Sequence, residues 1–201
     1  LFSFTNDKIV TNTIPVGGLG RQETRYLNSN GFYNASGFYN VSKPIRNRKY
    51  VFNLGGTLTY NNNVSYLNSE KNIGRNWLFI QRVATDIRIK KWLETTTGVN
   101  FTLNSTQYSL KSASLQNLSA QTWTFSHTTR IFLPRDFIIS YDLDKTLNNG
   151  YSETVAVNPF IINATLEKQL FKKKNGSIKL QAFDLLNENI SINRQVTANS
   201  I

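Results

Sequence analysis

Seven charged residues in the middle of this chain stand in extended segments, at positions where alternation would place them on one polar face. They are Arg82, Asp86, Arg88, Glu94, Arg130, Asp142 and Asp144. Successive side chains of a strand point to opposite faces, so residues two apart share a face. On a wall that encloses a water-filled interior, such charges would guide a solute or contact a domain inside it. The interpretation that we favour is the ordinary polarity of such an interior, with charges paired to one another, because polar linings are the rule for such interiors.

Catalytic and metal-binding residue types are scarce. His127 is the only histidine and shares its alternation with Trp123 and Phe125, so we expect it on an outer surface. Cysteine is absent, which excludes disulfides and thiolate metal sites. The glycines of GGLG (17–20) are not followed by the lysine and hydroxyl residue of a phosphate-binding loop. We therefore expect no enzymatic activity, no cofactor and no metal.

A net charge of +11 is compatible with nucleic-acid binding, but its placement argues against it. Much of the lysine and arginine lies in four short clusters and not in one stripe interleaved with aromatic residues. Solvated turns account for this distribution, and we expect no nucleic-acid partner. The clusters are Lys43–Lys49, Arg88–Lys91, Leu133–Asp136 and Lys172–Gly176.

The basic clusters recur at nearly constant intervals, and this spacing predicts a series of hairpins. From residue 44 to 90, 90 to 134 and 134 to 173, the steps are 46, 44 and 39 residues. Each unit holds two strands of the ~9–11 residues that cross a bilayer, with a short turn on one side and a long loop on the other. No apolar run approaches the ~18 residues of a membrane-spanning helix. The spacing therefore indicates an outer-membrane β-barrel.

The pattern predicts about nine strands. Longer polar loops are expected between them at PVGGLGRQETR, SYLNSEKNIG, SLKSASLQN and NNGY, with a bulge at Pro159. The predicted strands are Phe2–Thr13, Tyr26–Val41, Tyr50–Asn63, Trp77–Lys90, Trp92–Tyr108, Thr122–Leu133, Phe137–Leu147, Ser152–Phe171 and Ser177–Leu185.

The third predicted strand separates apolar from polar residues most clearly. Phe52, Leu54 and Leu58 share one face, whereas Asn53 and Thr57 share the other, and Leu58 is expected near mid-depth. Alternation also occurs in soluble β-sandwiches. Runs of about 12–16 residues, compared with the usual ~5–6, favour the membrane. A soluble β-sandwich adhesin is kept as an alternative.

Several segments also resemble a known family. GSIKLQAFDLLNENISINR (Gly176–Arg194), within Asn158–Ile201, is similar to the C-terminal barrel region of TonB-dependent-receptor-like outer-membrane proteins of the Bacteroidota type. SGFYNVSKPIRNRKY (Ser36–Tyr50) and YNNNVSYLNSEKNIGRNW (Tyr60–Trp77) resemble earlier hairpins of that group. The resemblance implies an all-β fold that is part of an antiparallel barrel of about 22 strands.

The resemblance also carries functional expectations. Residues 1–201 would be a partial barrel domain in the outer membrane of a Gram-negative bacterium, a fragment without plug or closing strand. Its partners would be membrane lipid, the rest of the barrel with its plug, a TonB-type energy-coupling protein and a surface lipoprotein. The implied function is uptake of a solute such as a metal chelate or an oligosaccharide. The alternative is a structural barrel that scaffolds an envelope complex without transport.

Overall fold

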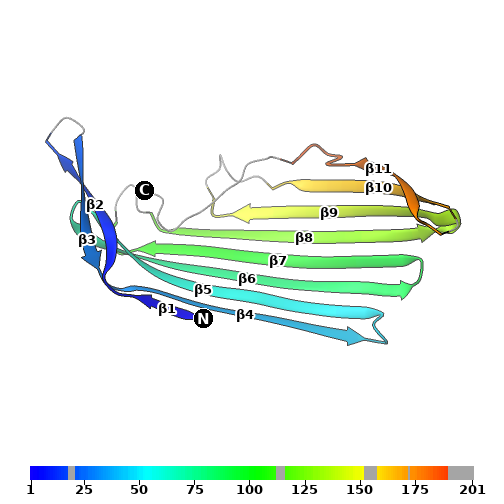
Figure 1. Cartoon of the computed structure of the whole chain (residues 1–201), viewed down its shortest axis with the longest axis horizontal. Helices are drawn as coiled ribbons and strands as arrows, with labels where there is room; N and C mark the ends of the chain where they lie inside the picture. The colour runs from blue at the N-terminus through cyan, green and yellow to red at the C-terminus, as the bar shows by residue number, and fades with distance from the viewer. Residues whose placement is uncertain (18–20, 112–115, 152–157, 172, 190–201) are drawn as a thin grey trace.

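The chain forms one large, curved antiparallel sheet (Figure 1). A computed structural model describes residues 1–17, 21–111, 116–151, 158–171 and 173–189. Within them the only helical segment is the short 3-10 turn η1 (Pro134–Asp136). The eleven strands are β1 (Phe2–Thr5), β2 (Lys8–Val16), β3 (Arg21–Ser29), β4 (Phe32–Ile45), β5 (Tyr50–Leu67), β6 (Glu70–Lys90), β7 (Leu93–Tyr108), β8 (Leu118–Leu133), β9 (Phe137–Asn149), β10 (Phe160–Leu170) and β11 (Gly176–Ala182).

The all-β antiparallel prediction is confirmed, but the strand count of nine is wrong at the N-terminal side. The predicted strand Phe2–Thr13 is broken after Thr5 into β1 and β2, with Asp7 in a left-handed conformation. The predicted strand Tyr26–Val41 is broken at Asn30–Gly31, where Gly31 has a φ of 101°. Aspartate and glycine tolerate positive φ, so these turns form inside segments that otherwise alternate.

The extra strands form a hairpin that stands away from the main sheet (Figure 1). Most of the predicted loop PVGGLGRQETR therefore lies in β2 and β3, which pair with each other from Lys8–Ser29 to Val16–Arg21. The hairpin joins the sheet through a short parallel contact of β2 with β5, at Asn12–Tyr66 and Thr13–Leu67. The main sheet runs in the order β1, β4, β5, and then in chain order to β11.

One other loop prediction and the bulge prediction also fail, whereas two loop predictions hold at least in part. NNGY begins within β9, which ends at Asn149, and its last two residues lie in the connection that follows. SYLNSEKNIG continues β5 and β6 to a two-residue turn, in which Asn68 and Ser69 both have positive φ, as a tight hairpin turn requires. Pro159 precedes β10 and makes no bulge within it; its carbonyl accepts a hydrogen bond from the Thr146 amide. SLKSASLQN connects β7 to β8 as predicted, although residues 112–115 and 152–157 lie outside the described part.

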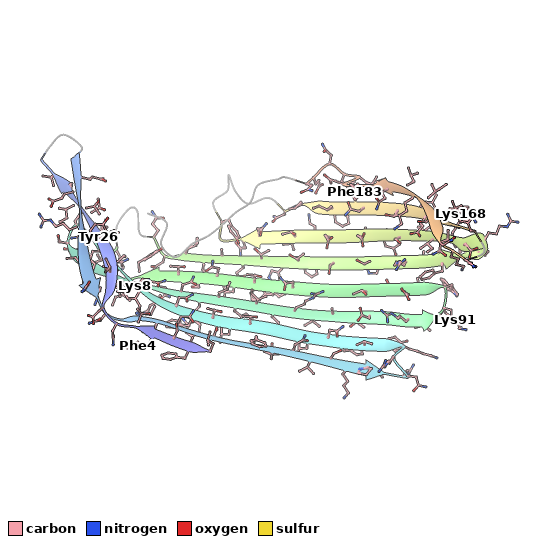
Figure 2. The ribbon with its side chains drawn as sticks, viewed as in Figure 1. Phe4, Lys8, Tyr26, Lys91, Lys168 and Phe183 are labelled. Atoms are coloured by element: carbon pink, nitrogen blue, oxygen red, sulfur yellow. The ribbon has the colours of Figure 1, made fainter. Side chains whose placement is uncertain are left out.

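The four basic clusters lie at one end of the sheet, which we call the short-turn rim. Lys91 and Lys168 mark this end in Figure 2. The last pairs before the turns are Ile45–Tyr50, Lys90–Leu93, Leu133–Phe137 and Leu170–Gly176. The opposite end, where the β2–β3 hairpin and the β7–β8 loop lie, is called the loop end.

Successive hairpins are staggered by a constant amount along the strands. One register row crosses the sheet through Tyr50, Ile87, Thr95, Thr129, Tyr141, Ala164 and Ala182. Relative to this row, the rim moves two residues further at each hairpin, from Tyr50 to Leu93, Leu133 and Leu170. The stagger is therefore one residue, or ~3.3 Å along the strand, for each ~4.8 Å step to the next strand. The strands are accordingly tilted by about 35° from the direction perpendicular to the rim. This is the tilt of closed barrels.

An aromatic line crosses the sheet parallel to the rim. Near the N-terminal side it contains Phe2, Tyr33, Tyr60 and Trp77, with the Tyr60 and Trp77 ring centroids 4.4 Å apart. On β7 and β8 the line continues with Phe101 and Trp123, whose ring centroids are also 4.4 Å apart. These two residues lie closer along their strands to the register row of Tyr50 than Tyr60 and Trp77 do. From Tyr50 to Tyr60 the strand rises ~33 Å, which a 35° tilt reduces to a height of about 27 Å. This matches the ~25 Å apolar band of an outer-membrane barrel.

Most of the best-buried residues gather at the loop end, although Ala84, Thr129 and Ile138 lie nearer the rim. Those at the loop end include Phe32, Val64 and Ala120, and also Asn12, Asn62, Asn72 and Asn76. Asn12 binds the β5–β6 turn through two hydrogen bonds to Ser69. Its Nδ2 donates to Ser69 Oγ and its Oδ1 accepts from the Ser69 amide, each at 3.2 Å. Asn72 Oδ1 accepts from the Leu110 amide at 3.2 Å. Amide side chains therefore join the projecting hairpins into one folded unit.

Neighbouring turns at the short-turn rim are joined by an ion pair. Lys174, between β10 and β11, contacts Asp136 of η1 at 2.8 Å. The hydrogen bond and positive charge of Lys174 hold the pKa of Asp136 below its ordinary value. A depressed carboxyl pKa means that the contact stabilises the fold above the ordinary aspartate pKa of ~3.9 and is lost as pH falls through the lower folded-state pKa.

Replacing Lys174 by glutamine should return the titration midpoint of Asp136 toward the ordinary aspartate value, because the cation that favours the carboxylate is gone. Carbon-13 NMR of the Asp136 carboxyl group measures this midpoint. Lys91→Gln, in the turn of another hairpin, is the control and should leave it unchanged. An Asp136 midpoint that does not move in Lys174→Gln would contradict the ion pair.

Candidate functional site

The two faces of the sheet differ in composition and in the placement of their carboxylates. The apolar face carries Phe52, Leu54 and Leu58 of β5, and the register places their cross-strand partners Thr85, Val83 and Phe79 on the same face. From β4 to β11, the strand carboxylates all lie on the other, polar face. They are Glu70, Asp86, Glu94, Asp142, Asp144 and Glu167. Lysine is tolerated on the apolar face, whereas carboxylates are confined to the polar one.

Six of the seven charged candidates lie on the polar face. Arg82 and Asp86 pair across β6 and β7 with Asn100 and Thr96. The other four are opposite polar residues or one another: Glu94 with Arg130, Asp142 with Thr128, and Asp144 with Ser126. Arg88 is the exception, because it follows Ile87, where the register with β7 shifts. Its amide donates to the Lys49 carbonyl at 2.7 Å, so it belongs to the short-turn rim.

Asp86 is held in a hydrogen-bonded chain that crosses four strands. Its Oδ1 accepts from Thr96 Oγ1 at 2.7 Å and its Oδ2 from Asn53 Nδ2 at 3.0 Å. Asn53 Oδ1 in turn accepts from Ser42 Oγ at 2.8 Å. A carboxylate that receives donors from both neighbouring strands is fixed in orientation, and this supports the polar face locally.

The expectation that these charges pair with one another is wrong for the described residues. Their salt bridges are Arg25–Glu23, Lys174–Asp136 and Lys179–Glu167, none of which joins two of the seven candidates. Arg130 is opposite Glu94 in register but stacks its guanidinium on Phe132, 5.4 Å from the ring centroid. Within the described residues, the candidates are therefore held by hydrogen bonds and ring contacts, as for Asp86 and Arg130, and not by salt bridges with one another.

A hollow lies on the polar face at mid-height of the wall. Gly55 stands in register between Asn40 and Arg82, so no side chain fills the row between them. The hollow is lined by Phe38, Asn53, Arg82, Asp86 and Asn100, among others. Phe38 is 87% exposed although it is a large apolar side chain on a polar face. An exposed aromatic ring beside amide and guanidinium groups can stack on a planar or apolar surface and hydrogen-bond its edges.

An asparagine ladder was missed in the sequence. Asn34 Nδ2 donates to Asn61 Oδ1 at 2.7 Å, and Asn61 Nδ2 donates to Asn76 Oδ1 at 3.5 Å. Asn76 Nδ2 then donates to Asn104 Oδ1 at 2.6 Å. The ladder crosses β4 to β7 on the polar face, at the height where Tyr60 and Trp77 lie on the apolar face. The run NNN at 61–63 was its sequence signal, but only the register reveals that the amides are neighbours.

His127 lies on the apolar face, as predicted, between Thr97 and Leu143 in register. Its Nδ1 is 2.7 Å from Thr97 Oγ1 and its Nε2 is 3.0 Å from Thr129 Oγ1. Its ring also stacks near Tyr141, with the centroids 5.8 Å apart. Both ring nitrogens are hydrogen-bonded within the sheet, which accommodates a polar ring on an apolar surface.

A second polar group on the apolar face is also enclosed by its neighbours. Gln81 Nε2 donates to the carbonyl oxygens of Gly55 at 3.0 Å and Arg82 at 3.2 Å, and Gln81 Oε1 accepts from the Tyr39 hydroxyl. The Tyr39 ring reaches Gln81 by lying over Gly56, where a Cβ atom would be 2.6 Å from it. Glycine at this position therefore lets tyrosine shield an amide from lipid.

Neither metal nor helical membrane features occur in the part of the chain that the structure describes. No group of three or more histidine, aspartate or glutamate side chains there is arranged to hold a metal ion. No helix among the described residues is long and apolar enough to span a membrane.

Long strands tilted by about 35°, an apolar face of about 27 Å between an aromatic line and a basic rim, and a polar opposite face define the wall of a transmembrane β-barrel. A comparison with family models agrees. The chain belongs to the Outer membrane protein beta-barrel family, whose model matches residues 17–201. This membership places the protein in the outer membrane, where the apolar face contacts lipid and the polar face lines the interior.

No curated protein and no solved structure matched the chain. The soluble β-sandwich alternative is wrong, because the described strands form one sheet without a second layer over its apolar face. The outer-membrane location and the membrane-lipid environment are confirmed.

Proposed function

We propose that this wall belongs to a receptor that takes up a solute through a plugged interior, with energy from a TonB-type partner. The observation that carries the proposal is the hollow around Gly55 on the polar face, with its exposed Phe38 and with Arg82 outside any salt bridge of the described residues. A wall that only scaffolds needs polarity, but it does not need an aromatic ring directed at water. Leaving such a ring in water forgoes about 1.5–3 kcal/mol of stabilisation that its burial would provide.

Two edges of the sheet support a larger barrel around the hollow. Beyond its pairs with β1, which end at Phe2–Ala35, the outer edge of β4 has no strand partner in the described residues, and neither has the outer edge of β11. Closed barrels leave no such edges, so further strands of the same protein would cover them. We propose a large barrel of about 22 strands that surrounds a plug, with a surface lipoprotein as a further partner.

The test is uptake by cells that carry the intact protein. Arg82→Ala should lower energised uptake of the solute, a metal chelate or an oligosaccharide, while heat-modifiable gel migration shows an intact barrel. Arg75→Ala, which removes an arginine from the apolar side beyond the aromatic line, is the matched control and should leave uptake unchanged. Uptake that persists when the TonB-type protein is absent, or that Arg82→Ala does not alter, would contradict the proposal. No uptake by cells that carry the unsubstituted protein would favour the scaffold function.

A further inference from the structure

Three lysines on the apolar face recur at one height beside the short turns, whereas the other apolar-face cations of β4 to β11 lie nearer the loop end. Those others are Lys71, Arg75 and Lys145. Lys43 of β4 is opposite Phe52, Lys90 of β6 is opposite Leu93, and Lys168 of β10 is opposite Phe137 and Ile178. Each lies within two residues of the last pair before a short turn, on a strand that runs into that turn. We call these three residues the rim lysines.

The rim lysines are outside the salt bridges of the described residues. The strand carboxylates from β4 to β11 lie on the opposite face. The turns beside them add more positive charge through Arg46, Arg48, Lys49, Lys91, Arg135 and Lys173. Asp136 of η1 is the one carboxylate in the described short turns, and its salt bridge is with Lys174. The lipid-facing border of the rim therefore carries an excess of positive charge.

The height of the rim lysines matches the level of lipid headgroups. The apolar band of about 27 Å begins at the rim, so a lysine there has its stem beside hydrocarbon and its ammonium group at the headgroup layer. Lys168 shows this arrangement, because its Nζ lies 4.5 Å from the Phe137 ring centroid and donates to the Arg135 carbonyl in the adjoining turn. Figure 2 places Lys168 and Lys91 at this end of the sheet.

We propose that the rim lysines form a binding surface for the phosphate groups of anionic phospholipids. An ammonium group gains most from a partner of full negative charge, and lysine near a membrane surface is worth about a fivefold change in affinity for anionic lipid. The same cations placed on the polar face would contact water and not headgroups. Their position on the lipid side is what distinguishes this surface from the solvated turns.

The experiment uses the intact protein in vesicles and a tryptophan at the rim. Trp92 lies in the β6–β7 turn, is 52% exposed and follows Lys90 by two residues. Trp77 and Trp123 are replaced by phenylalanine, as is any tryptophan elsewhere in the intact protein, so that Trp92 is the only fluorescent tryptophan. Quenching of its fluorescence by brominated lipids then reports which lipids lie near Trp92. Mixed vesicles contain dioleoylphosphatidylcholine and dioleoylphosphatidylglycerol, with bromine on one lipid or the other.

Brominated phosphatidylglycerol is expected to bind at Trp92 at least about fivefold better than brominated phosphatidylcholine. The triple variant K43Q/K90Q/K168Q should reduce this preference to near one. The control K8Q/K71Q/K111Q removes the same charge from the loop end and should retain it. Heat-modifiable migration verifies folding of each protein, and K90Q alone serves if the triple variant does not fold.

Equal quenching by the two lipids in the unsubstituted protein would overturn the proposal. An equal loss in the rim and loop-end variants would also overturn it, because net charge and not placement would then set the preference. Both results are independent of transport, so failure of the lipid surface and failure of the proposed uptake are distinguishable.

Discussion

Leu54→Arg is expected to destabilise the folded barrel by about 2–4 kcal/mol, the cost of a cation on the lipid side near the bilayer midplane. Leu54 is on the apolar face, four residues from Tyr50 at the rim and six from Tyr60 in the aromatic line. Its side chain therefore meets hydrocarbon at nearly maximal depth. Urea unfolding of the intact protein in vesicles, followed by tryptophan fluorescence, measures the change in free energy of unfolding.

Two matched variants test depth and face separately. Leu58→Arg is on the same face but only two residues from Tyr60 in the aromatic line, so it should cost no more than about 1–2 kcal/mol. Thr57→Arg faces the polar interior and should cost least. A destabilisation equal for all three arginines would show that the apolar face does not contact lipid.

Gly56→Ala is expected to destabilise the barrel by about 1–3 kcal/mol, because it forces Tyr39 away from Gln81 and leaves an amide oxygen on the lipid side without its donor. The new methyl group would lie 2.6 Å from the Tyr39 ring, closer than side-chain carbons approach. Unfolding in urea measures the loss. Gly37→Ala is the control, because Gly37 is on the same face, opposite Leu58, and a Cβ there meets nothing within 4 Å.

A double-mutant cycle identifies the mechanism. Tyr39→Phe removes the same hydroxyl donor and should cost a similar amount, so the two changes together should cost less than their sum. Additive effects would mean that Gly56 acts independently of the Tyr39–Gln81 hydrogen bond. If Gly37→Ala were as destabilising as Gly56→Ala, backbone freedom and not shielding would explain both.

The faces of the wall could be predicted from the sequence, because the face of a strand residue depends only on whether its position along the strand is odd or even. Once Leu54 and Leu58 are assigned to lipid, every paired residue across the ladder follows, including Asp86, Asp142 and His127. The four basic turns were also predictable, since proline, asparagine and clustered cations interrupt long strands. These inferences need no knowledge of partners far away in the chain.

The loop end could not be predicted in the same way. The breaks at Asp7 and at Gly31 depend on single positive-φ residues within otherwise strand-like segments. The clasp between Asn12 and Ser69, and the ladder from Asn34 to Asn104, join residues from separate hairpins. Polar residues at these positions favour a loop prediction, because asparagine is common in turns. The sequence alone does not indicate that a partner amide lies opposite it.

The hollow around Gly55 was missed for a related reason. A glycine in a strand weakens it, and its use becomes evident only when Asn40 and Arg82 are found on either side. The pairing of charges was predicted wrongly because residues of opposite sign in register need not have side chains that reach one another. Glu94 and Arg130 illustrate this point.

The constant stagger of the short-turn rim makes each hairpin an interchangeable building block. Duplicating or deleting one such block would widen or narrow the circumference while every remaining strand kept its inclination and membrane depth. An insertion of one residue within a strand would instead exchange lipid-facing and interior-facing side chains from that point onward. Gene variation in proteins built this way should therefore resize the pore in steps of two strands and concentrate smaller changes in the connecting loops.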